Sequence, residues 1–87
     1  MTFSEAAFEM LSQWAVSARP LHAILEGPSV LLDLRRVTVR VVGPVSLIVG
    51  SDEIDLSWHF LGSELILVDS KTVLMRSAKG EVCTLHG

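Results

Sequence analysis

The sequence contains a single cysteine, Cys83, among its 87 residues. No internal disulfide bond can form, whereas secreted domains of this size usually carry several. The first residues, Met1–Glu5, include neither a basic stretch nor a continuous apolar one, so they lack the pattern of a secretory signal peptide. We therefore expect a protein of the reducing cytoplasm.

Charge and long apolar runs are also scarce. Charged residues make up 20% of the chain and the formal net charge is −3, which disfavours nucleic acid as a partner because phosphate binding requires clustered Lys and Arg. The longest stretch without a charged residue, Val41–Ser51, has 11 residues and is interrupted by Gly43-Pro44. A transmembrane helix needs about 18 or more apolar residues. We expect no association with a membrane.

Apolar residues, in contrast, are abundant at 49% of the chain. A chain of this composition can bury enough surface to fold and is not expected to be disordered. Its length is enough for one domain and too short for two. We therefore expect residues 1–87 to form a single domain.

Residues 2–19 have the pattern of an amphipathic helix. Thr2 and Glu5 fit a capping box in which Thr2 is the N-cap. Pro20 ends the helix, because it disfavours helical geometry at the residue before it and lacks an N–H donor. We predict that the apolar face, and Trp14 in particular, packs against a β-layer. The residues of that face recur every three or four positions: Phe3, Ala7, Met10, Trp14 and Ala18.

The segment 20–28 is expected to be a short helix or a connector. Pro20 suits the first turn of a short second helix and Gly27 suits its end. The same residues also suit a short first strand, and we favour the helix. Gly27-Pro28 interrupts regular structure in either case.

From residue 29 to residue 86 the sequence is typical of β-structure, rich in Val, Leu and Ile with turns at Gly and Pro. The apolar alternation changes phase at Arg35-Arg36, so 29–42 is expected to be one long strand bent there, or two strands that meet there. The clearest strand is 53–60, where four apolar residues alternate with four polar ones. This alternation predicts a half-buried antiparallel strand.

These elements predict an α+β fold. An N-terminal amphipathic helix would pack on a curled, mainly antiparallel sheet or small barrel of five to six short strands. The short connections favour antiparallel neighbours. Small barrels of the Sm or SH3 type have this element order, but the comparison concerns architecture alone, since the signature residues of Sm proteins are not evident.

We expect no metal and no cofactor. Cys83 and His86 have C-x-x-H spacing, but residues three apart on a strand point to opposite faces, and zinc needs three or four converging ligands. The acidic run at 52–55 lacks the glycine and late glutamate of a calcium loop. A small enzyme with Cys83 as nucleophile and His59 as its base is one alternative, although no phosphate-loop or nucleophile-elbow pattern accompanies the pair. We expect Cys83 to be a buried apolar residue and the chain not to be an enzyme.

Three arginines form the basic cluster of the sequence. They would contact phosphates if the domain were an RNA-binding Sm-like or SH3-like barrel, or they interrupt an apolar strand and so discourage stray edge pairing. They could also pair with the acidic cluster, either between subunits or within one. The two clusters together are the candidate interaction surface: Arg35, Arg36, Arg40, Asp52, Glu53 and Asp55.

The sequence favours a non-catalytic domain that self-associates or binds a protein partner. A domain this small buries only about 60–65% of the surface of its unfolded chain. With few charges to cover the remainder, apolar surface is expected to meet another chain. RNA binding through the arginines is the first alternative, and the small enzyme is the second.

Overall fold

The computed structural model describes residues 3–43, 46–60 and 63–87. Within these ranges the chain forms one helix followed by seven strands. The α+β class and the N-terminal helix are confirmed, but the expected five to six strands are wrong. The elements are α1 (Glu5–Ser17), β1 (Leu21–Glu26), β2 (Leu31–Val42), β3 (Ser46–Gly50), β4 (Asp55–His59), β5 (Ser63–Asp69), β6 (Thr72–Ser77) and β7 (Val82–His86).

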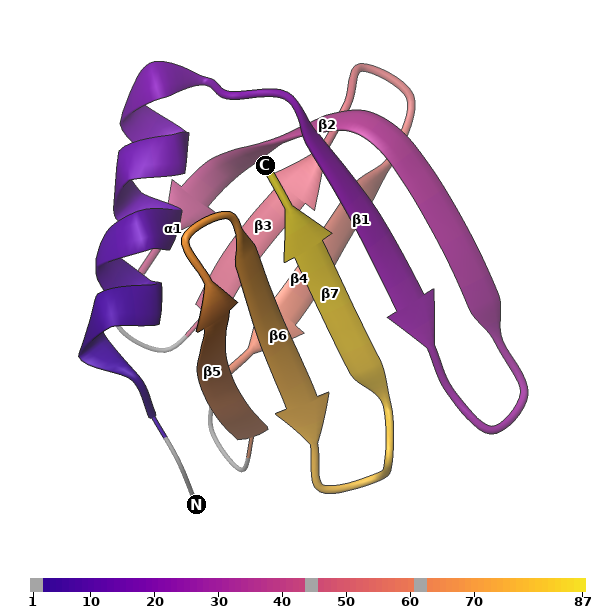
Figure 1. The fold of residues 1–87 in the computed structure, drawn as a ribbon. Coiled ribbons are helices and arrows are strands. Elements are labelled where there is room, and N and C mark those ends of the chain that lie inside the picture. The colour runs from indigo at the N-terminus through magenta and orange to yellow at the C-terminus, as the bar shows by residue number, and fades with distance from the viewer. Residues whose placement is uncertain (1–2, 44–45, 61–62) are drawn as a thin grey trace.

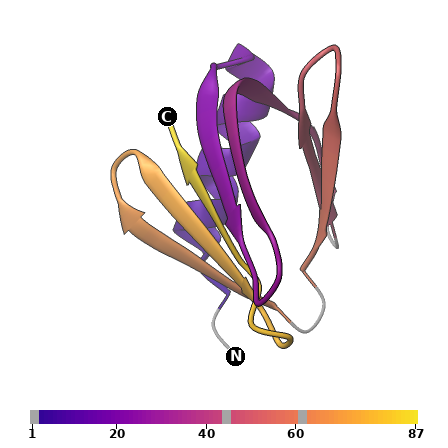
Figure 2. The same cartoon turned by 90° about the vertical axis from the view of Figure 1, so that its right-hand side faces the viewer.

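The strands form one antiparallel sheet in the order β4-β3-β2-β1-β7-β6-β5, which curls into a half-barrel of two layers (Figures 1 and 2). The front layer in Figure 1 contains β5, β6, β7, β1 and the first half of β2, and the back layer contains the second half of β2, β3 and β4. The helix closes one side of the half-barrel, where it contacts β2 and β5. Strand β4 ends the back layer on the side away from the helix.

Strand β2 belongs to both layers because it bends at Arg36. Leu21 of β1 lies opposite Val37, whereas His22 lies opposite Arg35, so Arg36 is an extra residue on β2. Its φ of 58° is in the left-handed region, as in a β-bulge. Beyond the bulge Val37 is buried, as the change of phase in the sequence predicted. The expected bend at Arg35-Arg36 is confirmed, and 29–42 contains one strand.

The helix expected over 20–28 is wrong, because Leu21–Glu26 forms strand β1 at the centre of the sheet. It pairs with β2 on one side and with β7 on the other. Leu21, Ala23 and Leu25 are buried and the residues between them are not, which is the two-residue period of a strand. Pro20 and Gly27 flank this strand as they would have flanked a helix. Pairing on both sides decided between the two structures.

Helix α1 begins and ends inside the predicted range 2–19. Ser4, not Thr2, is the N-cap, and its Oγ accepts a hydrogen bond of 3.1 Å from the N–H of Ala7. The predicted N-cap Thr2 lies outside the described residues. The helix ends at Ser17, and Ala18 adopts a left-handed conformation with φ of 50°.

The buried face of α1 consists of Ala7, Leu11 and Trp14. It is narrower than predicted, since Phe3 and Ala18 are exposed. The Trp14 ring packs near Leu21 at the start of β1 and Gly87 after β7. The prediction that Trp14 packs against the β-layer is therefore confirmed. The core lies between the layers and the helix and receives buried side chains from α1 and from each of the seven strands.

Candidate functional site

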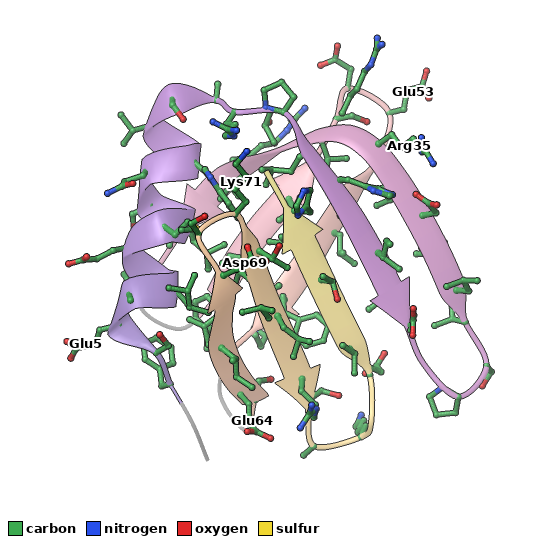
Figure 3. All side chains as sticks on the ribbon, in the orientation of Figure 1. Glu5, Arg35, Glu53, Glu64, Asp69 and Lys71 are labelled. Carbon is green, nitrogen blue, oxygen red and sulfur yellow. The ribbon has the colours of Figure 1, made fainter. Side chains whose placement is uncertain are left out.

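The structure places Arg40 with the acidic cluster inside one chain. Arg40 lies on β2, and its guanidinium is 3.6 Å (Nη2) from Asp52 Oδ1 and 3.8 Å (Nε) from Asp55 Oδ1. Glu53 projects from the same β3–β4 turn (Figure 3). These groups are exposed to solvent, where such pairs contribute little stability. Of the alternatives open for the two clusters, pairing within one chain is the one seen for Arg40.

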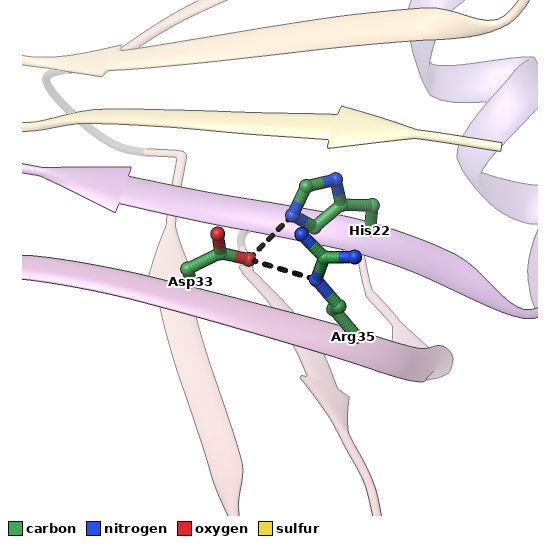
Figure 4. A network of polar contacts seen from close by, with 3 residues as sticks. All are labelled: His22, Asp33 and Arg35. Carbon is green, nitrogen blue, oxygen red and sulfur yellow. Dashed lines mark hydrogen bonds and ion pairs between the residues drawn. The ribbon is translucent and has the colours of Figure 1, made fainter.

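Arg35 lies before the bulge and contacts a different acid. Its Nε is 3.8 Å from Asp33 Oδ1, and the same oxygen lies 2.5 Å from Nε2 of His22 on β1 (Figure 4). The three arginines therefore do not share one set of partners. Arg35 and Arg36 instead border a shallow hollow of about 330 Å³ at the bend of β2, lined by Pro20, Leu21, His22, Arg35, Arg36 and His86.

Two histidines in that hollow were not predicted as site residues. His22 on β1 lies directly opposite His86 on β7 in the register of the front layer. Nδ1 of His86 is 2.8 Å from the Thr72 hydroxyl on β6. The sequence carried no signal for this pairing, since the two residues are near opposite ends of the chain and β1 was expected to be helical.

The polar row continues to Asp69 at the end of β5, beside Lys71 in the turn (Figure 3). The carboxylate accepts a 2.8 Å hydrogen bond from the N–H of Lys71. This bond, together with the Thr72 hydroxyl and the nearby His86, holds the pKa of Asp69 below its ordinary value. The row is a solvated arrangement on the outer face of the sheet.

Cys83 and His59 are not brought together. Cys83 is fully buried inside the half-barrel, and burial raises the pKa of its thiol to about 12. His59 is exposed on the outer face of β4. His86, three residues after Cys83, is on the opposite face of β7, as the spacing predicted. Among the described residues, no group of three or more His, Cys, Asp or Glu is positioned to hold a metal ion.

A second hollow, of about 370 Å³, lies beside β4. Its floor includes Trp58, whose buried Nε1 has no hydrogen-bond partner among the described residues. The hollow extends from β4 to the turn between β6 and β7 in the other layer. Its walls are Leu25, Leu56, Ser57, Trp58, His59, Ser63, Ser77, Ala78, Lys79 and Glu81.

The two end strands of the sheet differ in what covers them. Strand β5 is covered in part by the segment before α1, because Phe3 forms an isolated parallel bridge with Leu65 and the Ser4 N–H donates to Leu65 O at 2.9 Å. In the ranges 3–43, 46–60 and 63–87, no strand pairs with the outer side of β4. Strand β4 is therefore the uncovered end of the half-barrel.

The backbone groups of β4 that face outward can be assigned from its pairing with β3. The Ser51 N–H donates to Ile54 O at 2.8 Å, so Leu56 and Trp58 also bond toward β3 in an antiparallel ladder. The alternate residues then direct their N–H and C=O groups away from β3. We call the outward backbone groups of Asp55, Ser57 and His59 the β4 edge. One of them, His59 O, already accepts a 2.8 Å bond from Ser63 Oγ.

Comparisons with known proteins add no relative: no protein-family model, no curated protein and no solved structure matches this chain. In the described part of the chain, α1 is too short to cross a bilayer and no other helix is present.

Proposed function

We propose that this chain is a non-catalytic protein-binding module that self-associates. The observation that carries the proposal is the uncovered β4 edge. An unpaired edge strand presents free N–H and C=O groups to any chain that can extend the sheet, and proteins usually cover or interrupt such edges. Here β5 has a cover and β4 has none among the described residues.

Apolar side chains at this end of the half-barrel support the same proposal. Leu56 is only half-buried, and Ile54, just before β4, is 41% exposed. Leu32 and Leu34, on the first half of β2, face inward by register but are also only partly buried. Contact with another chain would remove this surface from water.

The remaining residues of interest favour binding over catalysis or RNA recognition. The Cys83 thiol is buried and stays protonated at neutral pH, so it is a poor nucleophile. Arg40 is already paired with acids, which weakens a combined phosphate-binding patch with Arg35 and Arg36. The buried free thiol also supports a reducing compartment such as the cytoplasm.

Sedimentation velocity of the full chain tests the proposal. We expect the weight-average sedimentation coefficient to rise with protein concentration between about 1 μM and about 500 μM, as mass action requires for an associating system. A single monomeric species over that whole range would overturn self-association.

A further inference from the structure

We propose that a second copy of this chain pairs with the β4 edge, antiparallel to the first, with a two-fold axis at Ser57. This inference rests on the self-association proposed above and names the surface that produces it. The two half-barrels would share one continuous sheet across the axis. Such an interface is isologous, because the same strand contributes on both sides.

The backbone fixes which registers are allowed. Outward groups must meet outward groups, so Asp55, Ser57 and His59 can pair only with one another in the second copy. With the axis at Ser57, Ser57 faces its own counterpart and Asp55 faces His59 of the second copy. This register pairs all five residues of β4, Asp55–His59, whereas a shift in either direction leaves part of the strand unpaired.

The side chains of β4 are complementary to themselves in the same register. On the outer face, the Asp55 carboxylate lies opposite the His59 imidazole of the second copy, twice per dimer. On the inner face, half-buried Leu56 lies opposite Trp58, again twice. Opposite-charge and aromatic–aliphatic cross-strand pairs both stabilise antiparallel sheets. If the axis moves to Leu56 or to Trp58, Ser57 replaces one partner and both charge pairs are lost.

There is room beside β4 for an incoming strand. The hollow of about 370 Å³ touches Leu56 and Trp58, which face inward, and also Ser57 and His59, which face outward. A space bordered by both faces of a strand must extend along its edge. Strand β4 also lies on the side of the molecule that faces the viewer in Figure 2, away from the helix. The existing Arg40 contacts use one oxygen of Asp55 and leave the second free for a new partner.

The first test removes the central donor. The Ser57 N–H points away from β3, so Ser57→Pro keeps the β3–β4 ladder and deletes two intermolecular bonds per dimer, one from each copy. We expect about a tenfold or larger rise in the dimer dissociation constant, measured by sedimentation. Ser57→Ala keeps the N–H and should sediment like the parent. Circular dichroism checks that each variant remains folded.

The second test exchanges charges and stays informative if the proline variant unfolds. His59→Asp places two carboxylates opposite each other and should raise the dissociation constant about two- to thirtyfold. Adding Asp55→Lys to His59→Asp restores opposite charges across the axis and should recover most of the parental affinity. A double variant no better than His59→Asp alone would overturn the proposed register.

The third test traps the axis itself. Ser57→Cys brings two thiols together at a Cα separation of about 5.5 Å, which a disulfide can span. Mild oxidation should give a covalent dimer, while the matched variant at an exposed turn, Ser70→Cys, should not. Cys83 is buried and does not compete. If the parent sediments as a monomer throughout, self-association itself fails. If the parent dimerises but Ser57→Cys fails to cross-link and the charge exchange has no effect, only the β4 interface fails.

Discussion

Replacement of Trp14 by alanine should remove most of the stability of this protein. The Trp14 side chain is only 6% exposed. A Cβ added to Gly87 would lie 2.9 Å from Trp14 Cζ2 and equally close to Leu21 Cδ2, which shows how tightly the ring fills the junction of α1, β1 and the end of β7. The substitution therefore leaves a cavity where three elements meet, and the backbone around it has little freedom to collapse.

The size of the effect follows from burial and chain length. Truncation of a buried tryptophan to alanine costs about 3–5 kcal/mol. At about 0.05–0.15 kcal/mol per residue, 87 residues have a total unfolding free energy of about 4–13 kcal/mol. For a domain of this size each kcal/mol lowers the melting temperature by about 4–8 °C, so we expect a fall of at least about 12 °C.

Thermal melting followed by far-UV circular dichroism measures this change. Gln13→Ala is the matched control, since Gln13 precedes Trp14 on the same helix but is exposed, and its replacement should change stability by no more than about 0.5 kcal/mol. If Trp14→Ala melted within about 3 °C of the parent, the ring would not be part of the core and the reasoning would be refuted.

Three further predictions concern single residues. Arg36→Gly should raise the urea midpoint by the equivalent of about 1 kcal/mol, because φ of 58° strains any residue except glycine; a lower midpoint would show that the arginine side chain stabilises the bend. Cys83 should react slowly with a thiol reagent in the native protein and rapidly in denaturant, since burial raises its pKa to about 12; rapid native labelling would contradict this. Asp69 has a lowered pKa in the folded state, so its contribution to stability is present above the unfolded pKa and lost as the pH falls through the folded one. Asp69→Asn should therefore lower the urea midpoint at pH 7 and have no effect at about pH 2, below both pKa values, and an equal loss at both would point to packing instead.

The features predicted correctly are those with a local cause. The phase change at Arg35-Arg36 is visible in adjacent residues, and it places the bend of β2 without knowledge of the partner strands. The apolar spacing of α1 predicted the burial of Trp14 for the same reason. The pairing of Arg40 with Asp52 and Asp55 was one of the open alternatives, because consecutive hairpins bring neighbouring segments together.

The features that were missed depend on contacts between distant segments. Leu21–Glu26 is flanked by Pro20 and Gly27, which suit both a helix and a strand, and only pairing with β7 from the other end of the chain decides for the strand. The same long-range pairing brings His22 and His86 together. Without the strand order, the hollow that they share with Arg35 and Arg36 could not be predicted.

The position of β1 between β2 and β7 has a consequence for the order of folding. The meander β2–β3–β4 is built from neighbours in the sequence and can form while the chain is still being synthesised. The ladder between β1 and β7 pairs Leu25 with Cys83 and Ala23 with Leu85, so one flank of β1 stays open until Val82–His86 has left the ribosome. Closure of this long loop is slow compared with hairpin formation. The nascent chain therefore passes through a stage in which the back layer is formed and β1 awaits the last strand, and a truncation within β7 should leave the molecule in that state.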